Sequence, residues 1–154
     1  MLELGSVFKG LSTAASVAKF IQSLIKSTRG IKRTLLLELQ QNIQLIYLHF
    51  ESGSLIDRII EKLDSSYYKK AIESNFNFNS LQKAKLKEEL INNVPQYKSY
   101  VGWTTEQLFT NIYIKIHTLQ TIVEIDAKNE KLRKNVRLIN ILKLMLLLLK
   151  HIKS

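Results

Sequence analysis

Residues 104–126 read TTEQLFTNIYIKIHTLQTIVEID and carry both the start signal and the apolar stripe of a long helix. Thr104 stands where an N-cap residue is expected, and Gln107 follows three residues later, as in a capping box. Trp103 and Leu108 take the positions of a hydrophobic staple. Apolar side chains then recur every three or four residues, at Phe109, Ile112, Ile116, Leu119 and Val123. This stretch therefore predicts an α-helix that begins after Thr104 and ends near residue 126.

Helical spacing continues on both sides of this stretch. It predicts helices over residues 5–28, 31–50, 54–72 (with Ser54 as N-cap) and 129–152, and a short charged helix over 80–93 that Pro95 ends. Together these predict an all-α fold resembling a four-helix bundle. A long crossover at 74–103, which holds the short extra helix, separates the second and third main helices. The chain is expected to form a single domain, 1–154, in which 1–28 is a semi-independent amphipathic helix.

The composition supports helices and restricts the chemistry. One proline and five glycines are few for 154 residues, whereas all-β proteins need many turn residues. The chain has no cysteine, which excludes disulfides and thiol chemistry and favours a reducing, cytoplasmic location. No stretch has the pattern of a secretory signal or the ~20 apolar residues of a membrane-spanning helix. A soluble cytoplasmic protein is therefore expected.

Positive charge is concentrated at the two ends of the sequence. The formal net charge is +10, with +5 in residues 1–33, +7 in residues 128–154 and −2 between them. Five residues form the densest candidate contact for an anion: Lys128, Lys131, Arg133, Lys134 and Arg137. They are able to neutralise phosphates, yet no aromatic residues are interleaved with them for base stacking. A solvated face that only aids solubility is the competing interpretation.

The last helix is apolar almost all round from Leu138 onward, so it lies either at the bundle centre or against another chain. The first segment has an apolar stripe and lysines without acids. That pattern suits a bundle helix, a helix docked in a partner or a helix on an anionic membrane. The candidate apolar interface therefore comprises Leu142, Met145, Leu148, Leu149, Val7, Leu11 and Ile21.

Tests for catalytic and metal-binding spacing fail throughout. His49, His117 and His151 have no second histidine or carboxylate three or four residues later, the spacing that joins metal ligands on a helix. The close acid pairs, 88–89 and 124–126, diverge on a helix, and no phosphate-binding glycine loop is present. We expect no catalytic residue, metal, cofactor or small-molecule substrate.

The sequence thus favours a non-enzymatic protein–protein interaction module that binds another protein or self-associates. An accessory or regulatory role in a bacterial system is a class-level analogy. The alternative is binding of nucleic acid or an anionic membrane through the basic terminal helices.

Overall fold

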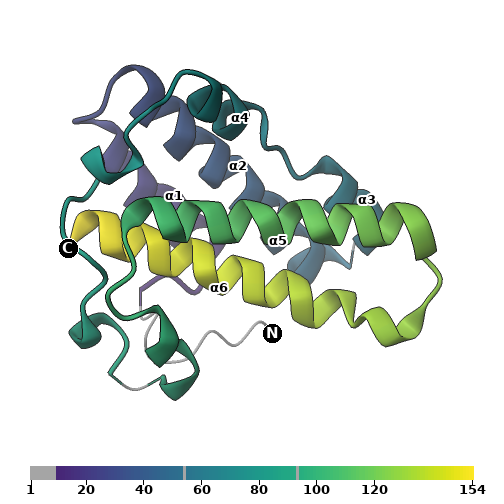
Figure 1. Cartoon of the computed structure of the whole chain (residues 1–154). Helices are drawn as coiled ribbons and strands as arrows, with labels where there is room; N and C mark the ends of the chain where they lie inside the picture. The colour runs from purple at the N-terminus through teal and green to yellow at the C-terminus, as the bar shows by residue number, and fades with distance from the viewer. Residues whose placement is uncertain (1–9, 54, 93) are drawn as a thin grey trace.

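Helices form the regular secondary structure of the described chain, as the sequence predicts (Figure 1). The computed structural model describes residues 10–53, 55–92 and 94–154. The long helices are α1 (Ala14–Ile25), α2 (Gly30–Ser52), α5 (Thr105–Asp126) and α6 (Lys134–Lys153), and the short ones are α3 (Ile56–Lys62) and α4 (Ser66–Glu73). Short 3-10 turns complete the list: η2 (Phe78–Ser80), η3 (Glu88–Leu90), η4 (Pro95–Tyr100) and η5 (Glu130–Leu132). The all-α fold class is confirmed.

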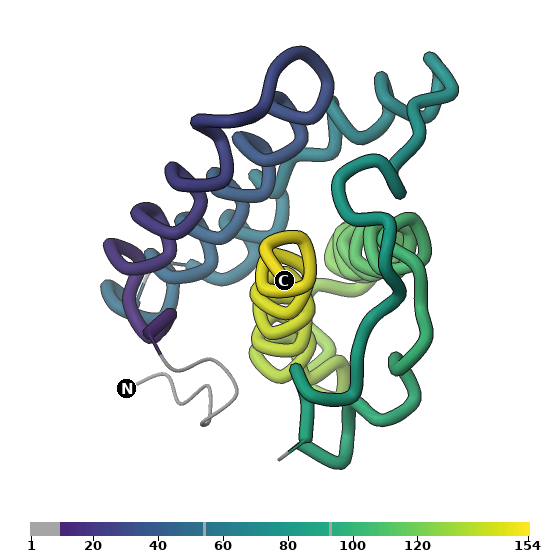
Figure 2. Tube along the Cα trace, turned by 90° about the vertical axis from the view of Figure 1, so that its left-hand side faces the viewer, coloured from purple at the N-terminus to yellow at the C-terminus, as the bar shows by residue number. Residues whose placement is uncertain are grey.

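The α6 helix lies at the centre of the molecule. Seen end-on in Figure 2, it has α1 and α2 on one side and α5 on the other. Residues 144–149 are all buried, so every side of this part of α6 meets another part of the chain. This packing explains the helix that is apolar almost all round, because a surface helix has only one apolar stripe.

The start of α5 is the best-predicted boundary. The Thr104 side chain accepts from the Gln107 N–H at 3.2 Å, and Gln107 Oε1 accepts from the Thr104 N–H at 2.8 Å. The predicted capping box is therefore confirmed. The helix ends at Asp126, as its stripe predicted.

The first helix is shorter than predicted. It begins at Ala14, after a capping box that Thr13 makes with Ser16, and ends at Ile25. Leu11 precedes it and is buried, and its carbonyl accepts a hydrogen bond from the Tyr47 hydroxyl at 2.8 Å. Residues 1–9, and with them the predicted role of Val7, lie outside the described residues.

The single helix predicted over 54–72 is wrong, because the chain breaks at 63–65 into α3 and α4. Side chains from other helices form hydrogen bonds with the backbone at this corner. Asn42 of α2 donates to the Asp64 carbonyl and accepts from the Asp64 N–H, both at 2.8 Å. Gln120 of α5 donates to the carbonyls of Ile60 and Leu63 at 3.0 and 2.8 Å. These side chains supply the hydrogen bonds that the backbone loses where the helix is interrupted. The break therefore leaves few backbone N–H and C=O groups unpaired.

The short helix predicted over 80–93 is also wrong. Among the described residues of this stretch, only the 3-10 turn η3 and the last residue of η2 have helical structure. The Leu86 N–H donates to the Trp103 carbonyl at 2.8 Å, and the Leu86 carbonyl accepts from the Gly102 N–H at 2.9 Å. Because this backbone pairs with residues 102–103, it is not available for a helical ladder.

The last helix begins five residues later than predicted. Arg133 has a left-handed backbone (φ 51°) and separates η5 from α6. The predicted basic cluster therefore spans a corner between two elements and does not lie on one continuous helix.

Candidate docking groove between α5 and α6

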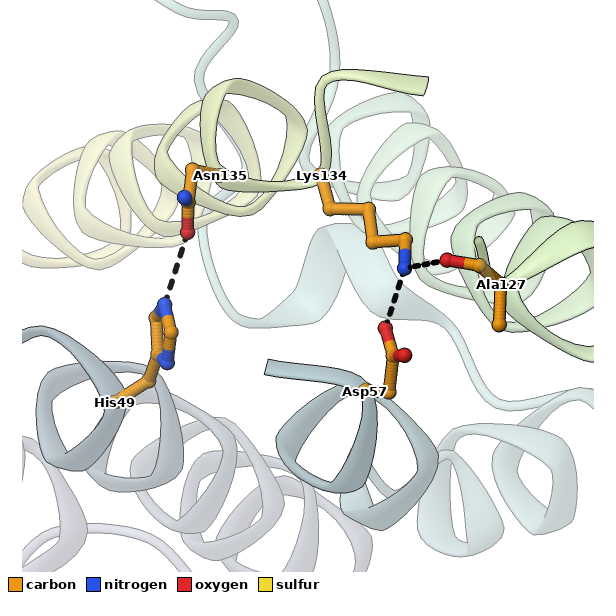
Figure 3. Close-up of polar contacts among 5 residues, drawn as sticks. All are labelled: His49, Asp57, Ala127, Lys134 and Asn135. Carbon is orange, nitrogen blue, oxygen red and sulfur yellow. Dashed lines mark hydrogen bonds and ion pairs between the residues drawn. The ribbon is translucent and has the colours of Figure 1, made fainter. Parts of the chain in front are cut away.

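The five predicted basic residues do not act as one free cluster. Lys134 is only 14% exposed, and its ammonium pairs with Asp57 Oδ1 of α3 at 2.7 Å. The same ammonium donates to the Ala127 carbonyl at the end of α5 (Figure 3). Arg137 donates through Nε to the Leu132 carbonyl at 2.8 Å. Lys134 is thus held in an ion pair that stabilises the fold. Arg133 is exposed at the corner, where its guanidinium is accessible to a ligand.

A second polar contact fixes the first turn of α6. His49 Nε2 of α2 lies 2.9 Å from Asn135 Oδ1, beside the Lys134–Asp57 pair (Figure 3). These two contacts attach one side of the turn to α2 and α3. The other side of the turn then faces α5 across an open hollow.

This hollow has a volume of about 470 Å³ and lies between α5 and the start of α6. It is lined by Ile114, Lys115, Thr118, Leu119, Lys131, Leu132, Arg133, Val136, Arg137, Asn140 and Ile141. We call it the α5–α6 groove. Its volume is within the range of protein ligand sites, about 300–1,000 Å³.

Four cations and no carboxylate line the groove. Three of them, Lys131, Arg133 and Arg137, belong to the predicted basic cluster, and Lys115 joins them from α5. All four are exposed. None of the four forms a salt bridge with another of the described residues. The groove therefore carries an unneutralised positive field.

Apolar side chains lie between these cations. Ile114 of α5 is 58% exposed and Val136 of α6 is 42% exposed. Ile125, three helical turns beyond Ile114 and so on the same face of α5, is 78% exposed. A concave, apolar surface with a charged rim is typical of an interaction site.

The groove continues toward the crossover. A second hollow of about 200 Å³ shares Lys115 and Asn140 with the first and adds Lys143, Leu144, Gln96, Tyr97 and Tyr100. Burial raises the pKa of Tyr97 to about 12, so its phenol stays protonated at neutral pH. No pattern in the sequence indicated this second hollow, because residues 96–100 are far from α6 in the sequence and only the fold brings them together.

The candidate apolar interface needs correction. Leu142, Met145, Leu148 and Leu149 are completely buried, and Leu11 and Ile21 are buried as well. They face the core of this chain and are not accessible to a partner in this structure. Of the two alternatives for the last helix, the structure has the one at the bundle centre.

The basic residues at the C-terminal end of the sequence divide between the two ends of α6. Lys153 lies over the Phe20 ring of α1 at 5.0 Å, and Lys32 donates to the Ser80 carbonyl at 3.3 Å. Lys153 and Lys32 therefore both lie near the end of α6. The groove lies near its start, about 25–30 Å away at 1.5 Å per residue.

One buried pair resembles a nucleophile with its base. Thr105 Oγ1 lies 2.9 Å from His151 Nε2, but the hydroxyl donates to the Gln82 carbonyl at 2.7 Å. The hydroxyl must then accept from Nε2–H, so His151 does not withdraw its proton. Both residues are buried, and His151 Nδ1 has no partner that would orient a base. The pair is structural: it joins the start of α5 to the end of α6.

A buried carboxylate is likewise structural. Glu38 of α2 is completely buried and accepts from the Tyr67 and Tyr68 N–H groups at 2.6 and 3.1 Å and from the Tyr113 hydroxyl at 2.7 Å. Burial raises the pKa of Glu38, against the lowering effect of these hydrogen bonds. It supplies the N-terminal cap of α4 from another helix.

The fold defines an all-α bundle around a central helix. No group of three or more potential metal ligands occurs in the described ranges, and no described helix has the length and hydropathy needed to cross a membrane. Compared with protein-family models, curated proteins and solved structures, the chain matches none significantly.

Proposed function

We propose that the protein is a non-enzymatic protein–protein interaction module that binds an acidic, partly apolar segment of another protein in the α5–α6 groove. The observation that carries this proposal is the lining itself: four cations and no acid around exposed Ile114 and Val136. Opposite charge speeds and orients docking, and burial of the apolar side chains contributes affinity.

The apolar floor distinguishes a protein partner from the polyanion alternatives. A phosphate backbone neutralises cations but gains little from Ile114 and Val136. A membrane surface is broad, and it does not fill a hollow between two helices. Self-association through this groove would bring two cationic surfaces together, which costs free energy. A different protein with carboxylates and apolar side chains satisfies both parts of the lining.

Charge reversal in the full chain tests the proposal. The groove-reversal variant carries Lys115→Glu, Lys131→Glu and Arg133→Glu, three exposed cations. The matched crossover-reversal variant carries Lys83→Glu, Lys85→Glu and Lys87→Glu, which are also exposed but lie outside the groove. We expect the wild type and the crossover-reversal variant to retain the same protein from the native host, and the groove-reversal variant to lose it.

Two results would contradict the proposal. One is equal retention of the partner by both variants. The other is recovery of nucleic acid in place of protein, with binding that nuclease removes and that falls steeply with salt. That second result would establish the polyanion alternative.

A further inference from the structure

The walls of the groove offer a ligand side chains but hardly any free backbone groups. The α5 and α6 helices pair their own N–H and C=O groups, and the Leu132 carbonyl already accepts from Arg137. An extended segment laid over Ile114 and Val136 would bury peptide groups without partners, which is costly. A helix pairs its backbone internally and brings no such cost. The lining therefore selects a helical occupant.

The length of the groove suits a short helix. Between Arg133 and Leu144, α6 advances by about 16 Å at 1.5 Å per residue. About three turns of helix match this length, enough for an apolar stripe of three or four side chains.

The cations flank this apolar floor on both sides. Lys115 lies on the α5 side, and Arg133 and Arg137 lie on the α6 side. A helix in the groove is best matched when acidic residues stand on both edges of its apolar stripe. From backbone, length and charge together, we infer that the occupant is a short acidic amphipathic α-helix of the partner, added to the bundle alongside α5 and α6. This inference rests on the proposed function.

Two peptides of identical composition test whether the bound segment must be helical or need only be acidic. Each has about 14 residues, leucines at helical spacing and glutamates beside them. One carries its proline at the first helical position, where a helix tolerates it, and the other carries the same proline in the middle, where it breaks a helix. Each is titrated into the full-length protein labelled with 15N, and amide shifts report the site and the affinity.

We expect the helix-compatible peptide to shift amides in 114–119 and 133–144. It should bind at least about tenfold more tightly than its isomer, a difference of 1.4 kcal/mol, because a central proline breaks the helix. Ile114→Glu in the groove should abolish the shifts. Ile72→Glu, at a similarly exposed isoleucine of α4 (47%), should leave them unchanged.

Equal affinity of the two isomers would overturn the helical inference and leave the proposed function standing. Failure of both acidic peptides to shift groove amides would overturn both. So would equal binding by a third peptide in which glutamine replaces every glutamate, because the cations would then play no part.

Discussion

At the residue scale, two buried ionisable side chains bind the helices together. Glu38 and His151 are the ionisable side chains among the buried polar residues, and neither takes part in the groove. The hydrogen-bond partners of both come from distant parts of the sequence. Spacing along one helix therefore gave no sign of their roles at these two junctions of the fold.

Replacement of Glu38 by leucine should destabilise the protein strongly. The Tyr67 and Tyr68 N–H groups and the Tyr113 hydroxyl would lose their acceptor. We expect a loss of about 3 kcal/mol in the free energy of unfolding, measured with urea, because each unpaired buried donor costs about 1–3 kcal/mol. Glu61→Leu, at an exposed position of α3, is the control and should change stability by no more than about 0.5 kcal/mol. Similar values for the two variants would refute the capping role of Glu38.

Acid should weaken the protein through His151. Burial lowers its pKa below the usual 6.5, and its Nδ1 has no acceptor when protonated. The unfolded chain then takes up the proton first, so the free energy of unfolding should fall as the pH drops from 6.5 through the lowered pKa. The wild type and His151→Gln share every other ionisable side chain, so comparison of the two isolates this contribution. Urea unfolding at pH 7.5, 6.5 and 5.5 should show a smaller loss in the variant; parallel curves would contradict the assignment.

At the element scale, local signals predicted some helices well and failed at others for a physical reason. The Thr104–Gln107 box and the stripe to Val123 are local, and α5 followed them. The break at 63–65 depends on Asn42, Gln120 and Glu38 from other helices. Likewise, the stretch 80–93 is held out of a helix by pairing with residues 102–103. Such long-range hydrogen bonds leave no trace in local periodicity.

The α3–α4 corner gives the prediction at this scale. Asn42 is completely buried and pairs with both backbone groups of Asp64. Asn42→Leu leaves the N–H and the carbonyl of Asp64 without these partners, and it should lower the free energy of unfolding by about 2–4 kcal/mol. It should also speed hydrogen exchange of the Asp64 amide. The adjacent Gln41 is exposed, so Gln41→Leu serves as the control. Slow exchange at Asp64 in the Asn42 variant would show that the corner does not depend on this side chain.

At the scale of the whole molecule, the fold redistributes what the sequence placed at its ends. The apolar last helix became the centre of the core, so the described residues of the predicted apolar interface are buried. The basic cluster was recognisable in the sequence, yet its division was not: Lys134 is held by Asp57, while Arg133 and Arg137 share a groove with Lys115. Lys115 lies 16 residues before Lys131, and only the antiparallel packing of α5 on α6 brings them together.

The central claim is that the α5–α6 groove binds an acidic amphipathic helix through its cations. A charge swap tests it most directly, with affinities measured by titration of fluorescent peptides. The groove-reversal variant should bind the acidic helical peptide at least about tenfold more weakly than the wild type does, a loss of 1.4 kcal/mol or more. A counterpart peptide with lysine at every glutamate position should bind that variant more tightly than it binds the wild type. If the acidic peptide binds both proteins equally, or the lysine peptide gains nothing from the reversal, the groove is not the docking site.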